Sequence, residues 1–497
     1  MAKMRQSGMK NSTLYLPGFH LATLRRRPRS AAQKLADEKS KIRRYSISQL
    51  GECFGQFIPA QELENGSSGS FSRRRLFSKE NTFWGFFSQV LDADGGCKEV
   101  VRKVQAFAAA RSIPAPSAST SAYCQARGKL EQDGLENILM HTASKLEQRG
   151  RNHWWKDRRV VVVDGTGVSM PDTPENQENW PQPSNQKSGC GFPQARICAC
   201  FCLQTGALLS YRMGHRKNAE LPLLRQQWDS FKSGDIFLGD KGFCSYYDVW
   251  KFKELGVDSV ITLARRIPVE ASSATAILGS DDLLIQWPKP AWSNNLSYSR
   301  DEWQALPEHL SLRQIKVTIN TPGMRSTSFY LVTTLTDSTR YSAAELADLY
   351  YQRWDVELFF RDIKTTMGMD VLRCRTPALV RKEILMHFIA YNAVRFLILD
   401  AANEAKQPPR RISFKAGIQA LRQWEPQFNQ VATNQREQRR LMGLLREAIA
   451  ASFVTERPGR REPRCVKRRP KPFALLTAPR HKMVEIPHRG RYRANVA

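Results

Sequence analysis

The stretch LADLYYQRWDVELFFRDIKTTMGM, residues 346–369, places unlike polar groups at helical spacing. If it forms one α-helix at about 100° per residue, four polar side chains fall within about 60° of each other: Tyr350, Arg353, Glu357 and Lys364. Their stripe carries a phenol, two cations and a carboxylate, with apolar bulk on the remaining faces. Such a helix can hold a metal ion and a phosphate chain together.

The same pattern has an ordinary structural explanation. Arg353 and Glu357 are four residues apart, so they could form a surface ion pair that contributes about 0.3–0.5 kcal/mol. That explanation is sufficient for one pair. It is weaker for the whole stripe, because two carboxylates further upstream stand where a catalytic site would need them.

The composition favours a protein that binds a polyanion. The 497 residues include 76 Lys and Arg against 47 Asp and Glu, which gives a formal net charge of +29. Nucleic acid is the first candidate partner for such a charge. A ribosome-associated or membrane-surface protein would share the charge but would not explain the carboxylates. The hydrophobic share of 41% is enough for folded cores, and the length favours about three domains.

No run of about 18 uninterrupted apolar residues is present, so no membrane span is predicted. The longest apolar run, residues 384–399, is interrupted by polar side chains. The first residues resemble a signal peptide only faintly, because Pro17 and His20 interrupt the apolar part and arginines follow it. We therefore expect an uncleaved, cytoplasmic protein.

Three cysteines alternate along one apparent strand, at Cys198, Cys200 and Cys202. Zinc sites need wider pairs such as C-x₂₋₄-C, so this spacing fits a metal site poorly. Alternating residues share one face of a strand. The pattern therefore favours buried, reduced thiols in the core.

The organisation of the chain follows from its periodicity and its breaks. Strand-like apolar runs alternate with helical ones after residue 150, which predicts an α/β fold with a mixed sheet covered by helices. The predicted segments are a mainly helical, basic part at 1–150, an α/β part at 151–265 and 341–400, a β-rich insertion at 266–340, and a helical part with a Pro- and Arg-rich tail at 401–497. Basic clusters mark the first segment at residues 25–29, 39–44 and 73–75.

Two aspartates follow short apolar strands. Asp164 follows VVVV and Asp240 follows IFLG. If these strands are neighbours in one sheet, both aspartates lie at one edge, where a helix can bring Glu357. Three carboxylates repel one another unless divalent ions such as Mg²⁺ join them. Two such ions about 3.5–4 Å apart can activate a water or a 3′-hydroxyl.

Each aspartate taken alone has a simpler reading. An Asp beside glycine at the end of a strand is often a turn residue. The run Asp164-Gly165-Thr166-Gly167 also hints at a dinucleotide loop, but Met170 stands where a third glycine is needed. The order of the two aspartates, an insertion and a helical glutamate is more informative than any one of them.

The spacing Tyr350-x₂-Arg353-x₃-Glu357-x₆-Lys364 resembles the YREK signature of bacterial insertion-sequence DDE transposases, the cut-and-paste group named after insertion sequence four. Asp164-Gly165-Thr166 is similar to the first acidic motif of that family and Asp240-Lys241-Gly242-Phe243 to the second. The resemblance covers about residues 75–480, including the tail KRRPKPFALLTAPR.

This resemblance implies a ribonuclease-H-like catalytic domain with a β-rich insertion, and helical N-terminal and C-terminal regions. It also implies hydrolysis at transposon ends, a hairpin intermediate and strand transfer into target DNA. The implied partners are double-stranded DNA, as inverted-repeat ends and target, and a second copy of the chain on that DNA. Charge and position alone, without a matching motif before residue 75, lead us to expect that residues 1–150 bind the ends. The protein is expected to be associated with the nucleoid.

The resemblance also implies roles for single residues. Asp164, Asp240 and Glu357 would hold two Mg²⁺ ions, with Mn²⁺ as the other option. Tyr350, Arg353 and Lys364 would hold phosphates of the transposon end. A tryptophan of the insertion would stack on a flipped base, and Trp287 is the candidate because it ends an apparent strand. Trp292 and Trp303 lie in the same region.

Two other functions remain open at this point. One is a catalytically inactive DNA-binding relative of such an enzyme. The other is a ribonuclease-H-like nuclease. The four-residue signature and the basic segments favour the transposase.

Overall fold

The computed structural model describes most of the chain, and all structural statements concern the residues 54, 57–73, 75–92, 95–110, 115–215, 220–263, 269–293, 298–319, 327–431, 434–454 and 475–483. The basic clusters at 25–29 and 39–44, and the basic tail at 455–474, lie outside the described residues. The chain divides into a first unit of residues 1–150, 366–368 and 384–454, and a second unit of residues 151–365, 369–383 and 455–497.

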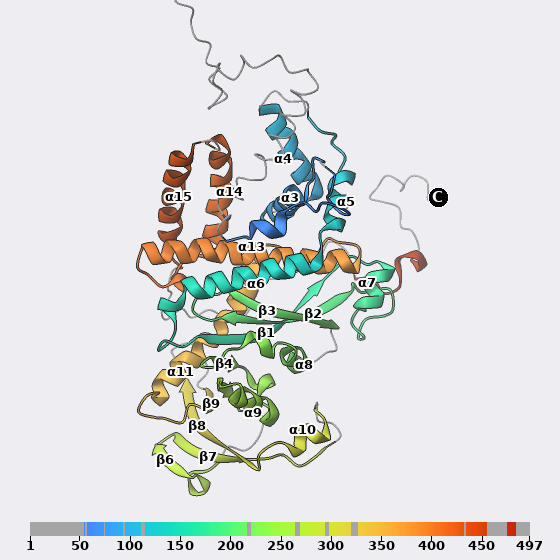
Figure 1. Ribbon diagram of the computed structural model, residues 1–497. Helices are drawn as coiled ribbons and strands as arrows, with labels where there is room; N and C mark the ends of the chain where they lie inside the picture. The colour runs from blue at the N-terminus through green and yellow to red at the C-terminus, as the bar shows by residue number, and fades with distance from the viewer. Residues whose placement is uncertain are drawn as a thin grey trace, which may run out of the picture. The chain divides into compact units, whose positions relative to one another are not determined.

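The second unit is built on one large sheet. Among the described residues, nine strands lie in the order β3-β2-β1-β4-β5-β9-β8-β7-β6 (Figure 1). Neighbours are antiparallel except that β1, β4 and β5 run parallel to one another. The strands are β1 (Val160–Ser169), β2 (Gln194–Cys202), β3 (Leu208–His215), β4 (Ile236–Gly239), β5 (Asp258–Thr262), β6 (Ala276–Gly279), β7 (Asp282–Pro288), β8 (His309–Ile319) and β9 (Thr327–Thr333). The predicted mixed α/β sheet is confirmed.

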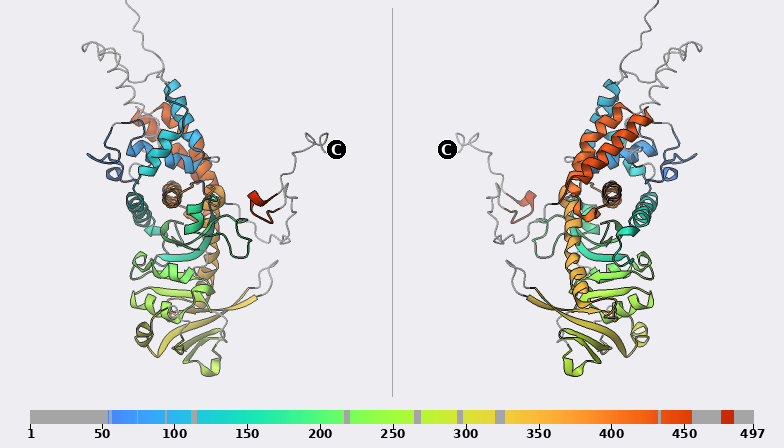
Figure 2. Two further views of the ribbon diagram at one scale, coloured as in Figure 1. Left: turned by 90° about the vertical axis from the view of Figure 1, so that its right-hand side faces the viewer. Right: turned by 90° about the vertical axis from the view of Figure 1, so that its left-hand side faces the viewer.

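The central strands are apolar because both of their faces are covered. All four valines that begin β1 are fully buried, as expected for a strand between two layers of helices. The helices of this unit are α7 (Pro174–Asn179), α8 (Glu220–Arg225), α9 (Tyr246–Glu254), α10 (Arg300–Gln304), α11 (Ala343–Tyr351) and α12 (Asp355–Arg361). The segment that contains α11 and α12 runs along one side of the strands (Figure 2).

The sequence prediction of one uninterrupted α-helix over residues 346–369 is wrong in its detail. α11 ends at Tyr351, a 3₁₀ turn spans Gln352–Trp354, α12 follows, and a π-helix spans Asp362–Thr366. A 3₁₀ turn tightens a helix and a π turn widens it, so side chains do not keep a 100° spacing. The reason lies in packing, because the 3₁₀ turn buries the Arg353 side chain against the rings of Tyr350 and Trp354.

Two further expectations need correction. β1 does not end at Asp164 but pairs with β2 as far as Ser169, so Asp164 is a strand residue and not a turn residue. The sequence also predicts one helix over residues 218–231, but in the described part of that range α8 ends at Arg225 and a 3₁₀ turn follows at Trp228–Ser230. The thiols of Cys198, Cys200 and Cys202 lie on β2, buried and free as predicted.

The first unit is helical in its described part. Its helices are α3 (Lys79–Leu91), α4 (Cys97–Ala110), α5 (Ser121–Lys129), α6 (Gln132–Arg149), α13 (Pro377–Glu404, whose first turns belong to the second unit), α14 (Phe414–Gln430) and α15 (Gln435–Ala450). Side-chain caps begin several of them, as when Ser78 accepts from the backbone N–H of Asn81 at 3.1 Å. In the described part of the chain, α13 alone is long and apolar enough to cross a membrane, and 94% of its apolar window is buried inside the protein. A buried core helix explains that composition.

A buried ion pair ties β1 to β4 where both strands begin. The Arg159 side chain donates to Asp235 (Nε to Oδ1, 2.9 Å) and to the carbonyl of Ser230 at 3.0 Å. The backbone N–H of Ile236 donates to the carbonyl of Arg159 at 2.9 Å. Both charged side chains are almost fully buried. This contact sets the level at which the two strands pair.

Replacing Asp235 tests the strength of this tie. Asp235→Ala leaves the Arg159 guanidinium buried without its counter-charge, so we expect the free energy of unfolding to fall by about 3–5 kcal/mol. Asp281→Ala is the control, because the Lys316–Asp281 pair is solvent-exposed at 3.8 Å and its loss costs less than about 1 kcal/mol. Urea unfolding of both variants measures the difference, and equal losses would contradict the proposed tie.

Candidate active site

The pairing of β1 with β4 places two aspartates level with each other. Their parallel register ends with Val162 opposite Leu238, and Asp164 and Asp240 each follow two residues later. Neighbouring strands lie about 4.8 Å apart, so the two side chains project at the same point of the sheet. The charge of Asp240 raises the pKa of Asp164, which agrees with their closeness.

Each aspartate is held by one backbone hydrogen bond. Oδ1 of Asp164 accepts from the N–H of Gly165 at 2.7 Å, and Oδ1 of Asp240 accepts from the N–H of Gly242 at 2.8 Å. Asp240 thereby caps the short 3₁₀ turn Lys241–Phe243. Among the described residues, the second oxygen of each carboxylate has no hydrogen-bond donor. Both oxygens are therefore open to a ligand.

α12 covers the face of the sheet that carries Asp164. Phe201 of β2 lies opposite Val162, and its ring contacts Phe359 and Phe360 at 5.5 and 5.2 Å between centroids. Paired and alternate strand residues share a face, so Val162, Asp164 and Thr166 point to this side. α12 also packs directly on β1. The helical segment with the signature residues thus lies over the first aspartate.

Lys364 reaches the same face from the π-helix. Its Nζ donates to Oγ1 of Thr166 at 3.1 Å, and Thr166 is two residues beyond Asp164 on β1. Insertions of this kind in a helix are common at functional sites. The structure therefore places the Lys364 ammonium on the same face of β1 as Asp164, two strand positions away.

Arg353 and Tyr350 are buried near the two aspartates and influence them electrostatically. Arg353 is 8% exposed, and its charge lowers the pKa of Asp164. Its Nε has no hydrogen-bond partner among the described residues. Tyr350 is 4% exposed, and its hydroxyl hydrogen-bonds with Thr262 at the end of β5. Burial is the main cause that raises the pKa of Tyr350, and Asp240 also raises it.

Glu357 lies on α12 with its side chain exposed. Within the described ranges, no three His, Cys, Asp or Glu side chains are grouped closely enough to bind one metal ion. The structure thus brings together Asp164, Asp240, Arg353 and Lys364, and it presents Glu357 on the helix that covers Asp164.

Glu220, at the start of α8, is a site residue that sequence reasoning missed. Its carboxylate accepts from Nη1 of Arg196 on β2 at 2.6 Å. It occupies the space where a Cβ at position 165 would lie, so Gly165 leaves the room for it. Its charge raises the pKa of Asp164 more than Asp240 does. The glycine directly after Asp164 was the sole hint in the sequence.

The environment of Asp164 disfavours its charged form in the absence of a cation. Burial is the largest cause, and together with the charges of Glu220 and Asp240 it raises the pKa from 3.8 to about 6. The hydrogen bond from Gly165 and the charge of Arg353 act in the opposite direction. A concentration of negative charge of this kind is typical of a functional site.

The candidate base-stacking tryptophans lie in the part of the sheet beyond β5. Trp287 is half-buried near the end of β7, with its ring edge-on to Tyr246 at 5.5 Å. Trp303 is engaged by Lys289 over its ring at 4.3 Å and donates Nε1–H to the carbonyl of Pro290 at 2.9 Å. The stacking role of Trp287 stays a prediction.

Comparison with known proteins shows which proteins this chain is similar to. The model of the transposase DDE domain matches residues 155–393, a range that includes all the site residues named above. The transposase InsG of insertion sequence element IS4 from Escherichia coli K12 is 24% identical over 445 residues, which are 88% of this chain and 95% of that protein. The probable transposase of insertion sequence element IS5377 from Geobacillus stearothermophilus is 41% identical over 56 residues, 11% of this chain and 15% of that protein.

Among solved structures, a piggyBac transposase synaptic complex with hairpin DNA covers 83% of this chain and 87% of its own, with a TM-score of 0.41 and 11% identity. The family model and the near full-length match to InsG agree with each other. Residues 155–393 therefore belong to the transposase DDE domain family, and the chain is similar over most of its length to the transposase of insertion sequence element IS4.

Proposed function

We propose that this transposase cleaves transposon ends and joins them to target DNA by metal-dependent phosphoryl transfer. The observation that carries the proposal is the level placement of Asp164, on β1 under α12, and Asp240, directly after the adjacent parallel strand β4. In this proposal the sheet β3-β2-β1-β4-β5 is a ribonuclease-H-like core, made from residues 151–265 and 341–400. Residues 266–340 are its insertion, and residues 1–150 and 401–497 flank it.

The types of donor at the site suit divalent ions, although Asp164, Asp240 and Glu357 are not grouped as a three-ligand site in the described part of the chain. Asp164 and Asp240 each keep one carboxylate oxygen without a donor among the described residues, and Glu357 is exposed on the helix above with no hydrogen-bond or ion-pair partner there. Mg²⁺ and Mn²⁺ prefer such hard oxygen ligands. We propose that these three carboxylates hold two ions. Bound there, the ions activate a water or a 3′-hydroxyl for attack on a phosphodiester.

The cations at the site bind and orient the DNA backbone. Lys364 lies beside Thr166 on the face of Asp164, where its ammonium can meet a phosphate. The Nε of Arg353 is buried without a hydrogen-bond partner among the described residues. We propose that the outer nitrogens of its guanidinium meet a phosphate, since this group can form two parallel hydrogen bonds. Tyr350 supports Arg353, whose guanidinium lies 5.9 Å from its ring centre. Direct contact of the Tyr350 hydroxyl with phosphate stays a prediction.

The further course of the reaction belongs to the same proposal. A hairpin at the transposon end, a flipped base on Trp287 and a homodimer that joins two ends follow from the family resemblance. Short inverted repeats on either side of the reading frame would support the proposal that this chain moves the DNA element that encodes it. The reaction then takes place on the DNA of the nucleoid.

Glu357→Gln removes one carboxylate charge from the site and keeps the size of the side chain. We expect DNA binding to persist and Mg²⁺-dependent cleavage of end DNA to fall by at least about 10²-fold, a loss typical of one electrostatic group. Glu254→Gln is the matched control, since Glu254 is exposed at the end of α9. A gel assay of cleavage and joining checks this, and full cleavage by Glu357→Gln would reject the role.

The same assay on the unaltered chain separates the two candidate enzymes. Cleavage without any joining would indicate a nuclease instead of a transposase.

Lys364→Ala removes a proposed phosphate contact. We expect weaker binding of end DNA and a salt dependence of log K that flattens by about 0.9 in slope, the value for one phosphate on duplex DNA. Lys253→Ala, at an exposed position of α9, should leave the slope unchanged. Binding measured across a series of salt concentrations decides the point, and an unaltered slope for Lys364→Ala would exclude the contact.

Asp164→Asn tests how much the charged carboxylate of Asp164 destabilises the folded protein. Because the folded pKa of Asp164 is raised from 3.8 to about 6, the protonated side chain favours the fold below about pH 4, and that stability is lost as the pH rises through about 6. The rise corresponds to about 3 kcal/mol. With a chelator present, we expect Asp164→Asn to melt at a higher temperature than the unaltered chain at pH 7.5, and at nearly the same temperature at pH 4. A lower melting temperature of Asp164→Asn than of the unaltered chain at pH 7.5 would contradict a destabilising effect of the buried charged carboxylate.

A further inference from the structure

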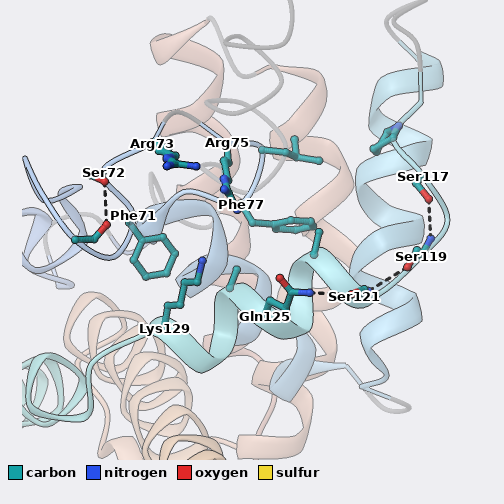
Figure 3. A pocket seen from close by; sticks show the side chains of 15 residues that line it. Phe71, Ser72, Arg73, Arg75, Phe77, Ser117, Ser119, Ser121, Gln125 and Lys129 are labelled. Carbon is teal, nitrogen blue, oxygen red and sulfur yellow. Dashed lines mark hydrogen bonds between the residues drawn. The ribbon is translucent and has the colours of Figure 1, made fainter.

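The first unit contains a pocket that the catalytic site does not use. Its volume is about 770 Å³, within the range of sites that enclose small ligands. It lies between the chain segment before α3, the segment before α5, and one face of α5 (Figure 3). The α5 residues in its wall recur at helical spacing, from Ser121 through Gln125 to Lys129.

Three cations line this pocket without counter-charges. Arg73 and Arg75 come from the segment before α3, and Lys129 extends toward them from α5 on the opposite side (Figure 3). No Asp or Glu is among the lining residues. None of the three cations has an ion pair or hydrogen bond with another described residue. Like charges around one cavity repel each other, so an anion would stabilise the arrangement.

The serines of the wall add hydrogen-bond donors. Ser117 and Ser119 accept backbone N–H bonds from Ser119 and Ser121 at 3.2 Å, and Ser121 accepts from Gln125 at 3.1 Å. A hydroxyl that accepts can still donate its proton. Within the described chain these three protons have no acceptor. Cations and hydroxyl donors together match phosphate oxygens.

One aromatic ring of the pocket is unused. Phe71 has φ 63°, a conformation that is rare and strained for a residue with a side chain and is concentrated at functional sites. Its ring contacts no other aromatic ring of the described residues. Phe77 differs, because it packs on Tyr123 at 5.4 Å and on the valines of α4. Phe71 is thus the ring that a ligand can meet.

We propose that this pocket binds an unpaired nucleotide of DNA, with its phosphates on Arg73, Arg75 and Lys129 and its base on Phe71. Cationic grooves with free aromatic rings are how proteins hold single strands. In a duplex the faces of the bases are stacked, so a duplex would leave Phe71 unused. The inference rests on the proposed action on DNA, and it adds a second strand-binding site to the one around Asp164.

The test uses the full chain with a chelator present, so it does not depend on cleavage. Binding of a thymidine oligonucleotide and of a duplex of equal length is measured by fluorescence anisotropy. Stacking of one base contributes about 1–3 kcal/mol, so Phe71→Ala should weaken single-strand binding by about tenfold and leave duplex binding unchanged. Phe71→Trp should restore it. Equal weakening for both DNA forms, or no weakening, would overturn the proposal.

The salt dependence of DNA binding distinguishes a local role of these three cations from a general effect of the positive charge of the protein. Each of Arg73→Ala, Arg75→Ala and Lys129→Ala should flatten the slope for the single strand by about 0.7, the value for one phosphate. Arg102→Ala is the control, since Arg102 is exposed on α4, outside the pocket, and bonded to Gln105 at 2.8 Å. Slopes that change alike in all four variants would refute a localised site.

A direct measurement on the unaltered chain avoids any effect of substitution on folding. An oligonucleotide with 5-iododeoxyuridine, irradiated in the complex, forms a covalent bond to an aromatic side chain that stacks on the base. Mass spectrometry should find the adduct on the peptide that contains Phe71. An adduct found elsewhere, with none on that peptide, would contradict the site. Full cleavage by Glu357→Gln would reject the catalytic proposal, and absence of this adduct would reject the pocket proposal. The two results are independent, so each proposal can fail on its own.

Discussion

The level at which β1 and β4 pair determines where the chemistry of this protein can take place. Arg159 and Asp235 form a buried ion pair directly before the two strands. Asp164 lies five residues after Arg159, and Asp240 lies five residues after Asp235. A slip of one residue would turn one aspartate to the other face of the sheet. The catalytic proposal therefore depends on a contact that takes no part in catalysis.

The two faces of β1 carry different parts of the site. α12 and the π-helix cover the face of Asp164 and Thr166, where Lys364 binds. The other face, at Gly165, is met by Glu220, which is paired with Arg196. Burial is the main cause of the raised pKa of Asp164, and the carboxylates of Glu220 and Asp240 raise it further. Divalent ions would stabilise the charged form of Asp164, as the charge of Arg353 already does in part.

Much of this arrangement follows from local sequence patterns, and the rest depends on contacts between distant residues. The valine run before Asp164 and the alternating cysteines predicted β1 and β2, because apolar patterning reflects burial. The pairing that brings Asp240 beside Asp164 depends on residues 76 positions apart, which no local pattern reveals. The 3₁₀ turn around Arg353, where its guanidinium packs on the rings of Tyr350 and Trp354, breaks the regular helix without a sequence signal that announces it. Glu220 lies in a short helix without a motif, so its place beside Gly165 became visible only in three dimensions.

The contact between Gly165 and Glu220 also limits how this active site can change over time. A side chain at position 165 would have to push the Glu220 carboxylate away from Arg196. A shorter residue at position 220 would create that space but leave Arg196 without its partner. Because the Glu220 side chain is flexible, it can turn aside for a larger residue at position 165. A substitution there would therefore alter the charges around Asp164 before it altered the fold.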